Sequence, residues 1–74
     1  MTPRKKPLTD AQLEAIIVDW GTLQASIMAL DEASLERAIK LERNGKDRFR
    51  IIMRLHQRFT RLRAERERRE LLGT

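Results

Sequence analysis

Apolar residues recur at intervals of three and four along most of the chain, which is the spacing of one face of an α-helix. This pattern predicts helices over residues about 10–20, 20–30, 32–43 and 47–72. The last is the longest because residues 46–72 contain no Gly or Pro, and its expected buried face is Phe49, Ile52, Leu55, Phe59 and Leu62. We therefore expect an all-α fold, a small bundle or hairpin of three to four helices.

Polar residues mark where these helices begin. Thr9 and Gln12 have the spacing of a capping box, in which each side chain binds the backbone N–H of the other. Asp19 and Asp31 are suited to be N-caps of the second and third helices. Gly21 leaves two possibilities open, because the first two segments could be separate helices or one helix kinked there.

Asn44 and Gly45 predict a left-handed C-cap that ends the third helix. The fourth then begins near Asp47, an acid well placed at the positive end of a helix dipole. Residues 1–7 hold two Pro and three positive charges with nothing to bury, so we expect a disordered basic arm. Residues 8–74 are expected to form a single helical domain.

A chain of 74 residues has room for only a small core, which usually needs reinforcement. The absence of Cys excludes disulfides, and the single His56 cannot hold zinc alone, so we expect neither a metal nor a cofactor. Self-association is the remaining reinforcement, and we expect a homodimer packed through the apolar face of the last helix. No apolar run is long enough to span a bilayer, and a cytoplasmic location follows.

Charge is divided unevenly along the chain, whose net charge is +5 and pI about 10.7. Residues 8–35 carry five acids and no Lys or Arg, whereas residues 46–74 carry ten bases and four acids. Arg outnumbers Lys by twelve to four, and its planar fork matches phosphates and carboxylates. The composition favours a polyanionic or acidic partner.

A stripe of Arg side chains is the candidate binding site. Arg50, Arg54, Arg58 and Arg61 lie within about 80° of one another around a helix. A solvated surface is the alternative, but solvated faces usually mix signs, and residues 48–63 contain no Asp or Glu. The full set of candidate contacts adds neighbouring bases and those of the arm: Arg48, Lys46, Arg4, Lys5 and Lys6. Trp20 is a candidate interface anchor, or else a core residue.

Beyond residue 63 the signs alternate, which predicts a helix end stabilised by its own ion pairs. The spacing of four predicts pairs between Arg61 and Glu65, Glu65 and Arg69, and Arg66 and Glu70. The bases of this segment are therefore not part of the candidate site.

Residues 41–72, with Asp19-Trp20 upstream, resemble small uncharacterised proteins of tailed bacteriophages. The shared pattern is Glu42-Arg43-x-Gly45-Lys46-x-Arg48, Ile52-x-Arg54-x-His56-x-Arg58-Phe59-x-x-Leu62-Arg63 and Arg66-Glu67-Arg68-x-Glu70-Leu71. The resemblance implies a phage accessory context, in which small basic helical proteins bind nucleic acid or a host protein. It assigns no role to any single residue.

Three functions remain open. An enzyme is not expected, since catalysis needs convergent polar groups in a pocket, and the polar groups here are mostly Arg and Glu on helix surfaces. The first expectation is a binding protein that contacts the backbone of DNA or RNA through the Arg stripe. The alternative is a module that binds and inhibits or redirects a host protein, with the Arg stripe against an acidic surface of that protein or the acidic first half against a basic one. The third is a virion or assembly component.

Overall fold

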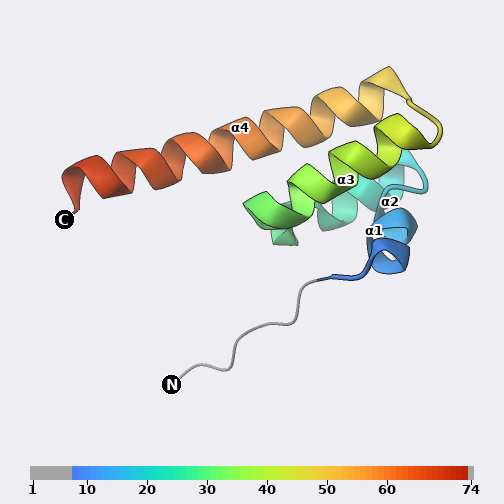
Figure 1. The fold of residues 1–74 in the computed structure, drawn as a ribbon, viewed down its shortest axis with the longest axis horizontal. Helices are drawn as coiled ribbons and strands as arrows, with labels where there is room; N and C mark the ends of the chain where they lie inside the picture. Colours follow the sequence, from blue (N-terminus) through green and yellow to red (C-terminus); the bar gives the residue numbers. More distant parts are fainter. Residues whose placement is uncertain (1–7, 74) are drawn as a thin grey trace.

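The computed structural model describes residues 8–73, and its regular structure is entirely helical (Figure 1). The elements are α1 (Asp10–Ile16), α2 (Trp20–Ser26), the 3-10 turn η1 (Ile27–Ala29), α3 (Glu32–Asn44) and α4 (Phe49–Leu72). The expected all-α class and the long final helix are confirmed. The arm expected over residues 1–7 lies outside the described part of the chain.

α3 and α4 form an antiparallel hairpin, and α1 and α2 pack at the end that holds its turn (Figure 1). α4 continues past the first residue of α3, and every described side chain from Arg63 onward is exposed. Each element contributes to one core, whose buried apolar residues are Leu13, Ile17, Leu23, Ile27, Leu30, Leu35, Ala38, Ile51 and Leu55. The core therefore stabilises only the first part of α4.

The expected N-caps of the first three helices are confirmed. Thr9 Oγ1 accepts the backbone N–H of Gln12 at 3.2 Å, and Gln12 Oε1 accepts that of Thr9 at 2.8 Å. Asp31 Oδ1 accepts the N–H of Ser34 at 2.8 Å at the start of α3. Each cap satisfies a backbone donor that has no partner inside its helix.

α1 and α2 are separate helices, which resolves the alternative that Gly21 left open. The Asp19 backbone is extended, with φ −150° and ψ 170°, and its Oδ1 accepts the N–H of Thr22 at 2.7 Å. This bond lowers the pKa of Asp19 below its usual value. α1 ends at Ile16, earlier than the expected boundary near residue 20, and α2 begins at Trp20.

The turn between α3 and α4 differs from the expected one. Gly45 has φ −105°, so the left-handed C-cap expected at Asn44-Gly45 is wrong. The residue with positive φ is Asp47, at 51°, and its N–H donates to the Glu42 carbonyl at 2.6 Å. α4 consequently begins at Phe49 rather than near residue 47.

The buried face of α4 also differs from the expected one. Phe49 is 76% exposed, whereas Ile51 is 4% exposed and Leu55 fully buried. Ile52 lies half-buried at the edge. Helix α4 has two overlapping apolar faces, one containing Ile52 and the other Ile51. The face that contains Ile51 is buried because α4 packs between η1 and α3. Because Leu55 is buried within the single chain, the expected dimer contact through that residue is wrong.

A candidate polyanion-binding row on α4

Arg50, Arg54 and Arg58, one per turn of α4, form the Arg row. The Arg50 guanidinium carbon lies 4.0 Å from the centre of the Trp20 ring, a cation–π contact. Arg54 Nε donates to Gln24 Oε1 at 2.7 Å. Arg58 is half-buried, and its buried Nε–H has no acceptor among the described residues. The row therefore lies along α2 and η1, rather than opposite the core.

Matching spacing on α2 and η1 explains this placement. Trp20 and Gln24 are four residues apart, as are their partners Arg50 and Arg54. One turn later, Met28 lines the same surface hollow as Arg58. Gln24 and Met28 are not among the residues predicted from the sequence, although they follow Trp20 at intervals of four, which was the available signal. The contacts with Trp20 and Gln24 restrict the directions in which the Arg50 and Arg54 guanidinium groups point.

The Arg row has no carboxylate within ion-pair distance among residues 8–73. Arg61, at its C-terminal end, is exposed and paired with Glu65 at 3.4 Å. The row is therefore a local concentration of positive charge that the described part of the fold does not neutralise.

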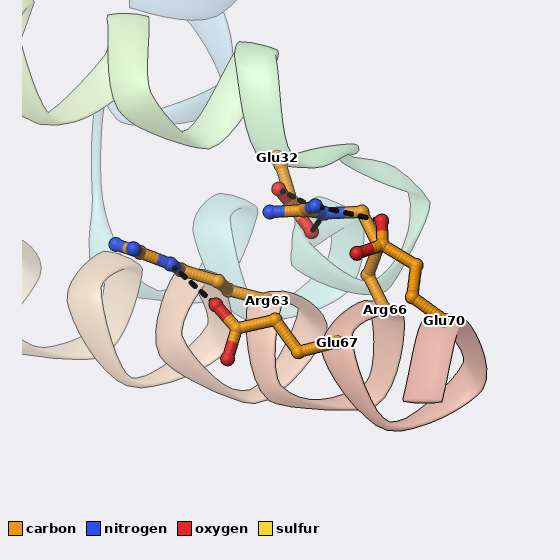
Figure 2. A network of polar contacts seen from close by, with 5 residues as sticks. All are labelled: Glu32, Arg63, Arg66, Glu67 and Glu70. Atoms are coloured by element: carbon orange, nitrogen blue, oxygen red, sulfur yellow. Dashed lines mark hydrogen bonds and ion pairs between the residues drawn. The ribbon is translucent and has the colours of Figure 1, made fainter. Parts of the chain in front are cut away.

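The end of α4 contrasts with the row, because two of its arginines, Arg63 and Arg66, are paired with carboxylates (Figure 2). Arg66 bridges Glu32 of α3 at 3.0 Å and Glu70 at 3.0 Å, which raises the pKa of its guanidinium. Arg63 pairs with Glu67 at 3.1 Å. The expected pairs Arg61–Glu65 and Arg66–Glu70 are confirmed, whereas the third i,i+4 pair of this segment is Arg63–Glu67 rather than the expected Glu65–Arg69.

Arg48 lies away from the row and is part of the fold. Its Nε donates to Glu42 Oε2 at 2.9 Å and its Nη2 to Glu42 Oε1 at 3.0 Å. The backbone N–H of Arg48 donates to the same Oε2 at 2.8 Å. Glu42 is 2% exposed, and these bonds lower its pKa below the usual range despite the opposing effect of burial. Sequence reasoning placed Arg48 at the surface site because the partner was not apparent from local spacing.

The same guanidinium also reaches the break between α1 and α2. Arg48 Nη2 donates to the Ile17 carbonyl at 2.6 Å, and Nη1 to the Val18 carbonyl at 3.1 Å. Carbonyls at a helix end lack intrahelical partners, so Arg48 satisfies those that the break leaves. This one side chain connects the α1–α2 corner to the α3–α4 turn.

The remaining candidate residues are placed as follows. Lys46 is exposed in the α3–α4 turn. Trp20 is half-buried, packs against the core and carries Arg50, so the structure favours a core role over an interface anchor. Arg4, Lys5 and Lys6 lie outside the described residues.

The surface of the protein beside the Arg row is open, which suits contact with the surface of a partner. An open hollow of about 1010 Å³ is lined by Met28 of η1 and, among others, Arg54, Arg58 and Arg61 of α4.

Within residues 8–73, no three carboxylate or imidazole groups are placed to hold a metal ion. In the same part of the chain, none of the helices combines the length and apolarity needed to cross a membrane.

Comparison with family models, curated proteins and solved structures found no match to this chain. The candidate site is therefore defined by its own geometry.

Proposed function

We propose that this chain is a non-enzymatic protein that binds the phosphate backbone of nucleic acid through the Arg row. The observation that carries the proposal is that Arg50, Arg54 and Arg58 have no carboxylate partner in the described structure, while the next three arginines along α4, Arg61, Arg63 and Arg66, do. Uncompensated positive charges repel one another, and a polyanion removes that repulsion. The cytoplasm of a phage-infected bacterium, the context implied by the resemblance, supplies such a partner.

Geometry supports contact with phosphates rather than reading of base edges. The three residues are about 6 Å apart along the helix axis, which is about one turn. The guanidinium groups of Arg50 and Arg54 are restricted by Trp20 and Gln24. A helix that reads sequence projects free side chains into a groove. The row is suited to affinity and to positioning, with little sequence preference.

Salt-dependent binding is the test. Labelled duplex DNA, single-stranded DNA and RNA are titrated with the protein at several salt concentrations. Each phosphate that the protein neutralises contributes about −0.9 to the slope of log K against log salt for duplex DNA. We expect the double variant Arg54→Gln, Arg58→Gln to bind at least tenfold more weakly, with the slope reduced in magnitude by about 2.

A matched control removes the same charge elsewhere. The double variant Arg43→Gln, Arg69→Gln also loses two positive charges, from exposed positions on α3 and on the end of α4. It should retain most of the affinity. Absence of binding to any nucleic acid at low salt contradicts the proposal, as does an equal loss in the two double variants. If no nucleic acid binds, capture of an acidic protein through the Arg row supports the alternative function, a module that binds a host protein.

A further inference from the structure

The solvent side of the first half of α4 is largely apolar and carries no charged residue. Phe49 is 76% exposed and Met53 42% exposed, and both lie on the same side as the exposed His56 and Thr60. We call these four residues the outer strip. At about 100° per residue, the outer strip is centred roughly 140° around the helix from Arg54. It is therefore a different side of the helix from the Arg row, although His56 and Thr60 border the hollow that Arg54 and Arg58 also line.

The outer strip has the spacing of a helix–helix contact. Its positions follow intervals of four, three and four, and Arg63 and Glu67 continue the same alternation. This is the heptad spacing by which two helices pack along a common seam. Ile52, half-buried beside the strip, widens the apolar surface. A single chain leaves this seam without a partner helix in the described structure.

We propose that the outer strip binds a second copy of this chain through an antiparallel pairing of two α4 helices, with His56 near the two-fold axis. In such an interface the same patch of each copy faces the other. Met53 of one copy then meets Thr60 of the other, and Phe49 approaches Arg63. The small core described above gains apolar burial from this contact.

Charge complementarity favours the antiparallel direction. In a parallel pair, Arg63 of each copy faces Arg63 of the other, and the two charges repel. In the antiparallel pair, Arg63 lies over an exposed aromatic ring, Phe49, which is a favourable cation–π arrangement. Glu67, which pairs with Arg63 of its own helix, also approaches the exposed Lys46 of the second copy. The antiparallel direction thus brings complementary groups together at both ends of the seam.

The seam is short, so the expected dimer depends on concentration. Four residues a side bury less than the surface of a standard stable interface. The pairing leaves the two Arg rows outside the contact, because they lie on other sides of their helices. Self-association and nucleic-acid binding thus use different residues and can fail independently.

Sedimentation equilibrium of the full chain tests the pairing. We expect a dimer that dissociates on dilution, and loss of that dimer in Met53→Glu and in Phe49→Glu. The second substitution also places an acid in the first turn of α4, where it favours the helix. Leu72→Glu is the matched control: Leu72 is 79% exposed at the last residue of α4, beyond the seam, and the dimer should persist. Circular dichroism confirms that each variant remains folded.

Three results overturn the inference. They are a monomeric wild-type chain at about 1 mM, a dimer unaffected by both strip variants, and a dimer that Leu72→Glu dissociates. None of these depends on nucleic-acid binding, which is measured separately on the same samples.

Single cysteines test the direction, since the natural chain has none. Mixed Met53→Cys and Thr60→Cys chains should form a cross-linked heterodimer under mild oxidation. Thr60→Cys alone should not cross-link, because its two copies lie about 10 Å apart along the antiparallel pair, beyond the reach of a disulfide. Efficient cross-linking of Thr60→Cys with itself, and none in the mixture, demonstrates a parallel pair and contradicts the proposal.

Discussion

Among the described residues, Glu42 and Arg48 are the pair of side chains that makes the most hydrogen bonds. The Glu42 carboxylate, which is buried, accepts three hydrogen bonds from Arg48, two from the guanidinium and one from the backbone. The same guanidinium binds the two carbonyls at the α1–α2 break. Local spacing would mark Glu42 as an acid on an apolar face, a placement that needs a partner.

Replacing Glu42 by Gln should destabilise the protein by about 2 kcal/mol, the scale of lost hydrogen bonds to a charged group. The amide cannot accept all three bonds, and it places an N–H₂ donor against the guanidinium. Chemical denaturation followed by circular dichroism measures the change. Glu36→Gln is the control, since Glu36 is exposed and paired with Lys40 at 3.6 Å. Equal effects in the two variants would contradict the role of the buried pair.

Acid should destabilise the wild-type chain partly through Glu42. The pKa of Glu42 in the folded chain lies below its ordinary value of 4.5, so protons bind the unfolded chain more readily. The stabilisation is therefore complete above about pH 4.5 and is lost as pH falls through the folded pKa. Unfolding free energies measured between pH 7 and pH 3 should fall less steeply for Glu42→Gln. An unchanged slope in that variant would exclude this source of pH dependence.

At the scale of elements, polar caps determine where helices begin. Asp19 and Asp31 each accept a backbone N–H three residues later, as their positions before apolar-periodic segments predicted. α4 differs, because its N-cap residue Arg48 makes no side-chain cap. The Glu42 carboxylate binds the Arg48 N–H instead, from the preceding helix.

Two glycines beside these caps should respond oppositely to Ala. At Gly21, in the first turn of α2, an added Cβ meets only Asp19 Oδ1 at 3.6 Å. Gly21→Ala should stabilise the protein by about 0.5 kcal/mol, because the unfolded chain loses entropy. At Gly45 the Cβ would lie 3.1 Å from the Leu41 carbonyl oxygen, so Gly45→Ala should lower the melting temperature. Thermal melts that shift in the same direction for both would contradict these contacts.

At the scale of the whole molecule, α4 belongs to two environments. Its first half packs on α3 and η1, whereas every described side chain after Leu62 is exposed. The ion pair of Arg66 with Glu32 links this end back to α3 (Figure 2). Exposed ion pairs contribute little to stability, so the end of α4 is expected to open separately.

Hydrogen exchange should show this division. Amides of residues 51–62 should exchange only through global unfolding, and those of residues 67–72 much faster, because no core contact resists their opening. Exchange read by NMR, residue by residue, measures the gradient. Uniform protection from 51 to 72 would show that α4 has a further packing partner along its end.

The sequence alone determined the class of fold, most helix starts and the division of α4 into an uncompensated stretch and a self-paired end. Those properties arise from contacts between residues three or four apart, which helical periodicity makes visible. Only the tertiary structure decided which face of α4 is buried, that Arg48 pairs with Glu42, and that the Arg row lies along Trp20 and Gln24. The contacts of the row and of Arg48 with the α1–α2 region join residues some thirty positions apart. Their pairing depends on how η1 and α3 pack around α4, which no local spacing specifies.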